Sequence, residues 1–322
     1  MKYPYLLLIP LLSISSCTNT VKTLKSRYTY FDTLETITIY DGLKDNMQKI
    51  EEILKTVHEE SDNYSTDNDL YKINTNSGRV ALSETLLGLI NQSSQLYGIT
   101  NGYFNPLVGS LSKKWKESLK DKQVLSQTII SEELEKINNT ELLFYYNDNI
   151  EIEVTKVGEA ELDFGGIAKG FALDQIKVYL EEANINSYLI DCGFSSILLG
   201  EKPTRNGNFN VGLNIPGVNN AYVQLKNCFI GASGTSEQGV EIDGVTYSHI
   251  VNPFTGSVIN EYDYTFVAGE SGSLCDAFAT AFMLMPLDMI KEYVEEYDLS
   301  VIIYKDSNLI YKTDDIEIKY HS

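Results

Sequence analysis

The sequence predicts an α+β fold with two lobes around a shared cleft. Apolar residues recur every three or four positions in segments such as 45–60 and alternate with period two in segments such as 27–40, so both helices and strands are expected. Because these segments do not alternate regularly along the chain, a doubly wound parallel sheet is not expected. A length of 322 residues suffices for one large domain or for two lobes.

The composition narrows the class of protein further. A hydrophobic content of 43% is typical of a globular chain rather than a disordered one. The formal net charge of −20 argues against a nucleic-acid-binding protein, which needs a basic surface. So many acids also repel a phosphate ligand, unless a divalent cation is held between the carboxylates and the phosphate.

The first residues have the pattern of a secretion signal. One positive charge, Lys2, is followed by a short apolar run and by small residues before Cys17. The run is too short to span a bilayer comfortably. Residues 14–17, Ile-Ser-Ser-Cys, resemble the bacterial lipobox, so we expect a signal peptide at 1–16, a lipid-modified Cys17 and a linker at 17–27. This indicates an extracytoplasmic protein anchored to a bacterial membrane; a signal peptide cut elsewhere, or a weak anchor, is the alternative.

The other three cysteines, Cys192, Cys228 and Cys275, fit neither a disulfide framework nor a metal-binding pattern, because their number is odd and their spacing is wide. We interpret them as small buried apolar residues. One pair could still form a bridge in an oxidising compartment.

The first half of the chain mixes both kinds of element with polar loops. Ser83 is expected to cap a helix, and His58, near the polar end of another, is interpreted as a solvated surface histidine. The expected elements are a strand at 27–40, helices at 45–60 and 83–97, a polar loop with a short helix at 61–74, turns at 101–106 and a charged segment with a hairpin at 116–150.

Residues 161–174 are the most informative stretch of the chain. A short apolar strand is expected at 161–164, then a turn at Gly165-Gly166 and a helix that runs to about Ala183. Glycines let a ligand approach the backbone closely, and the start of a helix offers unpaired N–H groups and a positive dipole end that suit a phosphate. Lys169 lies in the first turn and adds a full charge. The alternative is a turn with a surface lysine.

The second half is expected to contain mostly buried elements. The loop 231–237 is built of small residues, including Ser233 and Gly234, and is either a phosphate cradle or a flexible hairpin end. The other expected elements are strands at 187–193, 196–200 and 209–216, an apolar helix at 273–286, a helix at 286–297 and a C-terminal hairpin at 301–311.

Two polar residues of this half indicate chemistry. His249 lies in a loop with Pro253 and is either a general base or a structural histidine. Asp276 is the one charge on an apolar helix, and Thr280, four residues on, lies on the same helix face. A carboxylate and a hydroxyl together suit a hard cation such as Mg²⁺. Alternatively, Asp276 stabilises the N-terminus of the helix.

Four motifs resemble, in the same order, those of the ApbE family, the FAD:protein FMN transferases. They are Asp163-Phe-Gly-Gly-Ile-Ala-Lys-Gly170, Gly231-Ala-Ser-Gly234, His249-Ile-Val-Asn-Pro-Phe-Thr-Gly256 and Asp276-Ala-Phe-Ala-Thr280. The resemblance runs from about 28 to 311. The chain departs from the family pattern where Phe31-Asp-Thr33 replaces Met-Gly-Thr, where Asn105 replaces an aspartate and where Phe194 replaces a second glycine.

The resemblance implies one two-lobed catalytic domain at 28–322 that transfers FMN from FAD to a threonine or serine hydroxyl of a target protein, with Mg²⁺, and releases AMP. His249 is then the candidate general base, with Asp276 in reserve, and Asp276, Thr280 and the carbonyl of Ala168 hold Mg²⁺. The acceptor is a subunit of a membrane redox pump or an extracytoplasmic reductase. The residues implied to contact FAD are Phe31, Thr33, Tyr64, Asn74, Phe104, Asn105, Asp163, Gly165, Gly166, Lys169, Ser233, Gly234, His249 and Thr255.

Two other activities fit the same motifs. If water attacks in place of a hydroxyl, the protein is an Mg²⁺-dependent FAD pyrophosphatase. If nothing attacks, it is a flavin-binding lipoprotein. The presence of His249 and of the Asp276–Thr280 pair favours catalysis, and a purely structural lipoprotein would leave the aspartate on an apolar helix unexplained.

Overall fold

The computed structural model describes residues 23–76, 78–204, 207–235 and 239–321. The predicted signal peptide at 1–16 and the predicted lipidation site Cys17 lie outside these residues. The first strand, β1 (Leu24–Tyr30), begins inside the predicted linker, so the folded domain starts at Leu24 rather than at 28. Within the described part, no helix is long and apolar enough to cross a membrane.

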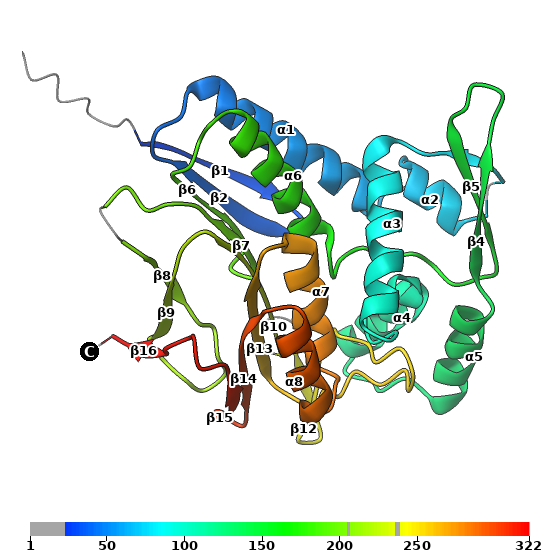
Figure 1. Ribbon diagram of the computed structural model, residues 1–322. Coiled ribbons are helices and arrows are strands. Elements are labelled where there is room, and N and C mark those ends of the chain that lie inside the picture. Colours follow the sequence, from blue (N-terminus) through cyan, green and yellow to red (C-terminus); the bar gives the residue numbers. More distant parts are fainter. Residues whose placement is uncertain (1–22, 77, 205–206, 236–238, 322) are drawn as a thin grey trace, which may run out of the picture.

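An eight-stranded antiparallel sheet is the framework of the larger lobe (Figure 1). Its order is β1-β2-β6-β7-β10-β13-β14-β15. After β1, the strands are β2 (Thr33–Ile39), β6 (Tyr188–Cys192), β7 (Ser196–Leu199), β10 (Cys228–Gly234), β13 (Tyr264–Gly269), β14 (Ser300–Lys305) and β15 (Asn308–Lys312). The two edge strands, β1 and β15, come from opposite ends of the chain, so the sheet is complete only when the whole domain is folded.

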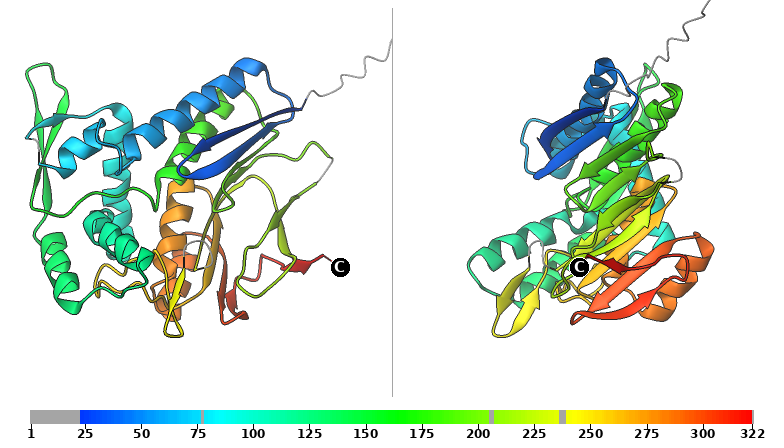
Figure 2. Two further views of the ribbon diagram at one scale, coloured as in Figure 1. Left: turned by 180° about the vertical axis from the view of Figure 1, so that it is seen from behind. Right: turned by 90° about the vertical axis from the view of Figure 1, so that its left-hand side faces the viewer.

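Both faces of this sheet are covered, one by helices and the other by a small sheet (Figures 1 and 2). The helices are α1 (Lys44–Ser61), α6 (Ala168–Glu182), α7 (Gly272–Phe282) and α8 (Leu287–Glu296). The small sheet consists of β16 (Lys319–Tyr320), β9 (Ala221–Leu225) and β8 (Phe209–Gly212). Strand β14 shows both contacts, because Val301 and Ile303 pack toward the helices and Ile302 packs toward the small sheet.

The smaller lobe is mainly helical and occupies the right-hand side of Figure 1. It contains α2 (Asp69–Asn74), α3 (Glu84–Ile99), the 3-10 turn η1 (Pro106–Val108), α4 (Gly109–Lys120) and α5 (Gln127–Asn138), with a sheet of β3 (Val80–Ala81), β5 (Ile152–Val157) and β4 (Glu141–Tyr146). A separate hairpin of β11 (Val240–Ile242) and β12 (Val245–Tyr247) precedes His249. The Trp115 indole donates to the Gly256 carbonyl at 2.8 Å and thereby ties α4 to the loop that carries His249.

Helices α6 and α7 cross in close contact. A β-carbon at Gly170 would lie 2.2 Å from the Gly272 carbonyl oxygen, so only glycine allows this approach. Each helix also caps the other. Asp276 of α7 accepts a hydrogen bond from the Gly170 N–H at 2.7 Å, and Asp174 of α6 accepts from the N–H groups of Gly272 and Ser273 at 2.6 and 2.9 Å. The otherwise unpaired N–H groups at both helix starts are therefore satisfied across the crossing.

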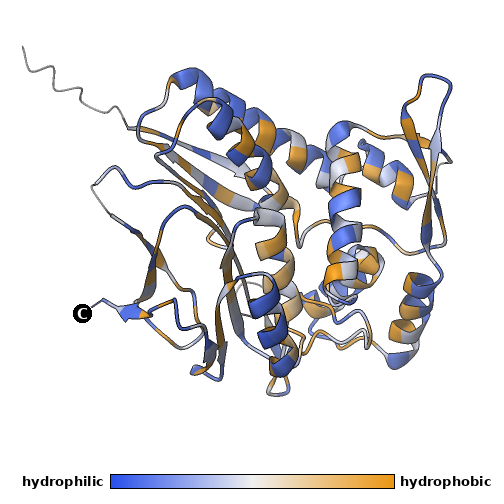
Figure 3. Cartoon of the chain, viewed as in Figure 1, coloured by the Kyte–Doolittle hydropathy of each residue, from blue (hydrophilic) through white to orange (hydrophobic). Residues whose placement is uncertain are grey.

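Helix α7 is the most deeply enclosed helix in this packing. Figure 3 shows that it is apolar along most of its length, whereas α1 has a polar outer face. The burial data agree, because Phe278 and Phe282 are fully buried between the sheet, α3 and α8. An aspartate in the middle of this helix is thus held where water does not reach it freely.

Most of the predicted elements are present. The helices expected at 45–60, 83–97, 273–286 and 286–297, the short helix before residue 74 and the C-terminal hairpin are confirmed. Ser83 caps α3 as expected, because its hydroxyl accepts from the Leu86 N–H at 3.0 Å. Helix α5 lies in the charged segment for which only a hairpin was predicted. The three described cysteines are free, and Cys192 and Cys275 are buried.

Two predictions for the N-terminal part are wrong. The strand expected at 27–40 is a hairpin, because Phe31 and Asp32 both take positive φ values, 46° and 57°, and reverse the chain. His58 is not a free surface residue. Its Nδ1 accepts from the Phe31 N–H at 3.2 Å, and its ring contacts those of Tyr30 and Phe31. His58 therefore stabilises the turn between β1 and β2.

Two further predictions are wrong because backbone groups have other hydrogen-bond partners than expected. Residues 161–164 are extended but belong to no sheet, because Asn74 pairs with both backbone groups of Leu162 in place of a strand. The loop expected at 231–237 begins as the end of strand β10, since Ser233 and Gly234 pair with Thr265 and Tyr264 of β13.

We expect Asp174→Ala to lower the free energy of unfolding by about 2–4 kcal/mol, because the α7 N-terminus loses a charged hydrogen-bond acceptor. Urea unfolding of the two proteins measures this difference. The control is Glu295→Ala, at an exposed position of α8, which should change stability by less than about 0.5 kcal/mol. Equal unfolding midpoints for Asp174→Ala and the unmodified chain would show that the cap is not needed.

Candidate active site

A cavity of about 160 Å³ brings together residues that lie far apart in the sequence. We call it the His249 cavity. Seven of the predicted site residues line it: Phe104, Asn105, Asp163, Gly165, Gly166, His249 and Thr280. They come from the turn before η1, the stretch before α6, the loop after β12 and helix α7. The structure therefore brings these seven residues together in one cavity.

The glycine pair forms one wall of the His249 cavity. A β-carbon at Gly166 would lie 3.0 Å from the Phe104 ring, and one at Gly165 would lie 3.1 Å from Oδ1 of Asp163. The Gly165 N–H donates to the same carboxylate at 2.8 Å. Side chains at these two positions would therefore fill the space that the turn leaves open, as the sequence suggested.

Residues 161–163, which we call the strip 161–163, are held in place by hydrogen bonds, and Asp163 of this strip lines the His249 cavity. Asn74 donates to the Leu162 carbonyl at 3.0 Å and accepts from its N–H at 2.7 Å. The Asp163 N–H donates to the Pro106 carbonyl at 2.7 Å. Burial raises the pKa of the Asp163 carboxyl, while the Gly165 N–H and the charge of Lys113 oppose that rise.

His249 has the properties of a neutral base. Its backbone is held on both sides, because the Ser248 N–H donates to the Val258 carbonyl and the Ile250 N–H donates to the Ser248 hydroxyl, both at 2.9 Å. The surrounding protein, and then the charges of Lys169 and Lys116, lower the pKa of His249 from 6.5 to about 4. By its accessible surface, His249 is an exposed residue. At neutral pH an uncharged imidazole therefore faces a cavity that a substrate can reach.

Asp276 lies behind the cavity, one helical turn before Thr280. It is buried and accepts from the Gly170 N–H at 2.7 Å and from the Ser196 hydroxyl at 2.8 Å. Burial raises the pKa of Asp276 to about 7, although the charge of Lys169 opposes this. The alternative role, N-terminal charge for α7, belongs to Asp174, which makes the hydrogen bonds at that helix start.

The donor set here fits a hard cation only in part. Asp276 offers one buried carboxylate, Thr280 of the same helix lines the cavity, and Ala168 is the first residue of α6. In the described part of the chain, no three acids, histidines or cysteines cluster in a way that could hold a metal. Mg²⁺ commonly binds through one or two carboxylates and completes its shell with water and substrate phosphates, so the residues present are compatible with it.

Lys169 is the central positive charge of the site. Its ammonium donates to the Ser195 hydroxyl and lowers the pKa of both His249 and Asp276. The start of α6, however, is not a free phosphate site, because the Gly170 N–H is already bound to Asp276. The role of Lys169 as a contact of FAD stays a prediction, and this use of the helix N-terminus was not expected from the sequence.

Several predicted contact residues do not line the His249 cavity. Phe31 and Thr33 lie at the β1–β2 turn, where the Thr33 hydroxyl donates to Glu35 at 2.9 Å. Thr255 is exposed, and its N–H donates to the Asn252 side chain at 3.1 Å. Ser233 and Gly234 belong to β10.

Sequence reasoning missed Glu35, a fully buried carboxylate near Lys169. Burial raises its pKa, while the Tyr30 N–H and the Thr33 hydroxyl donate to it. The sequence does indicate that Glu35 is buried, because it lies on the same face of the strand as the buried residues Ile37 and Ile39, two and four positions later.

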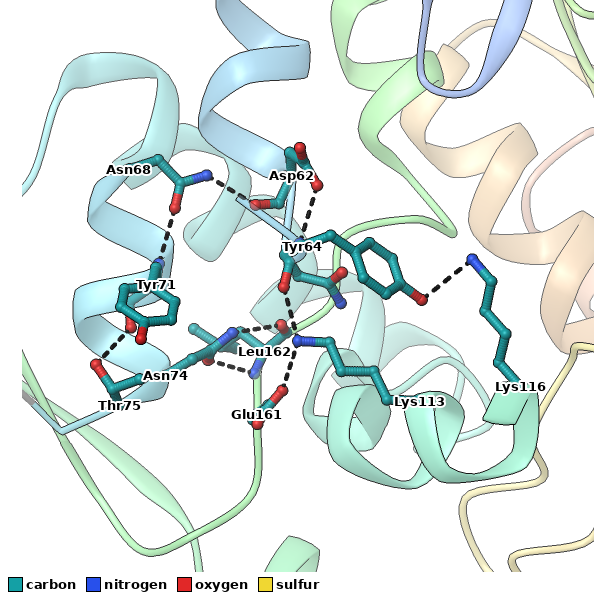
Figure 4. Close-up of polar contacts among 11 residues, drawn as sticks. Asp62, Tyr64, Asn68, Tyr71, Asn74, Thr75, Lys113, Lys116, Glu161 and Leu162 are labelled. Carbon is teal, nitrogen blue, oxygen red and sulfur yellow. Dashed lines mark hydrogen bonds and ion pairs between the residues drawn. The ribbon is translucent and has the colours of Figure 1, made fainter. Parts of the chain in front are cut away.

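A second hollow of about 370 Å³ lies between α2, α4 and the strip 161–163 (Figure 4). We call it the lysine pocket. Tyr64 and Asn74, two predicted flavin contacts, line it rather than the His249 cavity. The ammonium groups of Lys113 and Lys116 lie 5.2 and 4.5 Å from the Tyr64 ring centroid. The pocket combines aromatic faces with positive charge, a suitable surface for a ring that bears negative charge.

The lysine pocket also includes residues that the sequence did not single out. Lys113, Lys116 and Lys120 recur at positions i, i+3 and i+7, so they share one face of α4. In the printed sequence they look like part of a charged surface helix. Only the packing of α4 against the 61–64 loop, through the hydrogen bond from Lys113 to the Asn63 carbonyl at 2.6 Å, turns them toward a pocket.

Comparison with known proteins agrees with this geometry. The model of the ApbE family matches residues 31–303. Two FAD:protein FMN transferases are similar in sequence: that of Vibrio cholerae is 28% identical over 83% of this chain and 79% of its own, and that of Chlamydia muridarum is 24% identical over 86% and 89%.

Two solved structures have the same fold. The ApbE protein of Thermotoga maritima superposes with a TM-score of 0.74 at 22% identity, covering 93% of this chain and 97% of its own. The flavin transferase ApbE of Vibrio cholerae gives a TM-score of 0.71 at 23% identity, covering 94% and 97%. The fold and the order of its motifs thus define a flavin-transferase-like class of α+β protein. This chain belongs to the ApbE family.

We expect the His249 imidazole to titrate well below pH 6.5, because the protein and two lysines disfavour its charged form. NMR titration of the ring proton signals measures this directly. Lys169→Gln should raise the pKa of His249, since one repelling charge is removed, whereas Lys305→Gln, at an exposed position of β14, should not. A His249 signal that titrates at or above 6.5 in the unmodified chain would contradict the assignment.

Proposed function

We propose that this protein is an FAD:protein FMN transferase that uses Mg²⁺ to move FMN from FAD onto a threonine or serine hydroxyl of a target protein, with release of AMP. The observation that carries the proposal is the His249 cavity, where the neutral histidine, the glycine turn and Thr280 meet in a chain of the ApbE family. The names of the similar proteins support flavin transfer in general. The metal, the acceptor residue and the leaving group are our proposal.

In the proposed reaction, the acceptor hydroxyl oxygen forms a bond to the phosphorus of the FMN half of FAD. The bond from that phosphorus to the bridging oxygen breaks, and its electron pair leaves with AMP. His249 accepts the hydroxyl proton, because a hydroxyl is a poor nucleophile at neutral pH and the uncharged imidazole can act as a base.

Asp276, Thr280 and the Ala168 carbonyl are the proposed metal ligands. A bound Mg²⁺ would supply neutralisation of the diphosphate and so make AMP a better leaving group. Asp276 is suited to this role, because a bound cation would stabilise the charged form of a carboxylate whose pKa burial raises to about 7. Lys169 adds positive charge close to the same phosphates.

We propose that FAD contacts both hollows. The strip 161–163 separates them and contributes Glu161 to the lysine pocket and Asp163 to the His249 cavity. The flavin ring is then near Tyr64 and Asn74, and the diphosphate is near His249.

The second candidate function is an Mg²⁺-dependent FAD pyrophosphatase. The solvent-exposed part of His249 favours it, because water reaches the same base that an acceptor hydroxyl would reach. A flavin-binding lipoprotein without activity is the third. It gives no role to the neutral histidine in the cavity.

The location of the protein is also part of the proposal. We propose an extracytoplasmic lipoprotein, anchored to a bacterial membrane through Cys17, on the pattern of its first seventeen residues. The acceptor is then a subunit of a membrane redox pump or an extracytoplasmic reductase.

The direct test incubates residues 18–322 with FAD and Mg²⁺, with and without an acceptor domain that carries a target threonine. Mass spectrometry follows the acceptor and chromatography follows the nucleotides. An FMN-sized adduct together with AMP establishes the transferase. Free FMN and AMP without an adduct on any tested acceptor indicate the pyrophosphatase, and tight FAD binding without either product indicates the carrier.

We expect Asp276→Ala and Asp276→Asn to abolish Mg²⁺-dependent turnover, because each removes the charge of the proposed metal ligand. The asparagine variant keeps the size of the side chain and its hydrogen-bonding oxygen, so it separates loss of charge from loss of packing. Asp288→Asn, with a fully open side chain on α8, is the control and should keep normal turnover. If Asp276→Asn matches the unmodified protein at limiting Mg²⁺, the metal assignment is wrong.

We expect His249→Ala to slow transfer by roughly 10²–10⁴-fold while FAD binding is retained, because general-base catalysis contributes about that much. Single-turnover kinetics and equilibrium dialysis measure the two quantities separately. If FAD binding is lost together with transfer, His249 has a structural rather than a chemical role.

A further inference from the structure

The turn between β6 and β7 presents an aromatic ring to solvent in an unfavourable backbone conformation. Phe194 is 74% exposed and has a φ of 66°, in the left-handed region that bulky residues avoid. Phe31, in the neighbouring β1–β2 turn, also has a positive φ, but its ring packs on His58. No such contact accounts for the ring of Phe194 among the described aromatic pairs.

The surroundings hold this turn rigidly. The Phe194 N–H donates to Oδ1 of Asp191 at 2.8 Å. On the other side, a β-carbon at Gly193 would lie 2.6 Å from Cβ of Thr33, so the β1–β2 hairpin packs directly against the turn. The backbone of the turn is thus in contact on two sides, while the ring of Phe194 remains exposed.

The position of the turn connects it to the proposed active site. Three consecutive residues differ in their surroundings. Phe194 is exposed to solvent, the Ser195 hydroxyl accepts a hydrogen bond from the Lys169 ammonium, and the Ser196 hydroxyl donates one to Asp276. Lys169 follows the Gly165-Gly166 wall of the His249 cavity by three residues. The exposed ring is thus next in sequence to two residues that contact Lys169 and Asp276.

We infer that Phe194 is a ligand-binding residue whose ring stacks on a flat heteroaromatic ring of the dinucleotide substrate. An aromatic face beside an ammonium group matches a ring that is linked to a phosphate, and base–aromatic stacking is a general mode of recognition for such rings. The inference rests on the proposed function, because it takes FAD as the ligand. FAD contains two such rings, and because the isoalloxazine is proposed to lie near Tyr64 and Asn74, adenine is the ring expected on Phe194.

Phe194→Gly tests the inference, because glycine adopts the observed φ without strain. We expect two opposite effects. The melting temperature should rise by roughly 2–4 °C, since the strain is relieved. The affinity for FAD should fall by roughly five- to a hundredfold, since a stacking surface is lost. Phe194→Trp should keep the affinity. A residue with a merely structural role would not combine higher stability with weaker binding.

Ile150 provides the matched control. It is also apolar, 80% exposed and at a positive φ of 65°, but it lies in the β4–β5 hairpin, far from the β6–β7 turn in Figures 1 and 2. Ile150→Gly should raise the melting temperature in the same way and leave FAD binding unchanged. A loss of FAD binding in Ile150→Gly as well would overturn the inference.

Equilibrium dialysis with FAD, AMP and FMN, without an acceptor, separates the outcomes. Weaker binding of AMP with unchanged binding of FMN in Phe194→Gly supports adenine as the stacked ring, whereas weaker binding of FMN alone overturns the assignment to adenine. If the unmodified protein binds FAD and transfers FMN, but Phe194→Gly binds all three ligands normally, only the inference about Phe194 fails. If the unmodified protein binds none of them, both the inference and the proposed function fail.

Discussion

The reciprocal capping of α6 and α7 is the constraint on which the site depends. Gly170 and Gly272 let the two helices touch, and each helix contributes an aspartate to the N-terminus of the other. Asp174 has a purely structural part in this arrangement. Asp276 has the same geometry but lies where Ser196 and the Lys169 charge also reach it, so one carboxylate serves both the crossing and the proposed metal site.

This constraint explains the electrostatics of the site. An enclosed helix places Asp276 where burial raises its pKa to about 7, and the adjacent lysine partly offsets that cost. The surrounding protein lowers the pKa of His249, and the same lysine, together with Lys116, lowers it further. Positive charges from both lobes thus reach one imidazole, although the chain as a whole is strongly acidic.

The sequence predicted the parts of the fold that local patterns encode. Long periodic helices and the capping residue Ser83 are of this kind, and so are the motifs that line the His249 cavity. It failed where tertiary contacts replace local preference. Asn74 substitutes for a neighbouring strand at Leu162, and Phe31 takes a turn conformation that its side chain disfavours. The inward-facing lysines of α4 could not be recognised either, because their direction depends on a loop fifty residues earlier.

The close α6–α7 contact also determines which parts of the molecule can move. Two helices joined by backbone contacts and by hydrogen bonds in both directions cannot slide past each other, so the glycine wall and Thr280 form a fixed half of the His249 cavity. Most of the remaining lining comes from the loops before η1 and after β12, and Val108 of η1 and Ser112 of α4 complete it. A ligand in this cavity therefore meets two kinds of wall, one set by the helix crossing and one set by loops that their own hydrogen bonds, such as that from the Trp115 indole to the Gly256 carbonyl, hold in place.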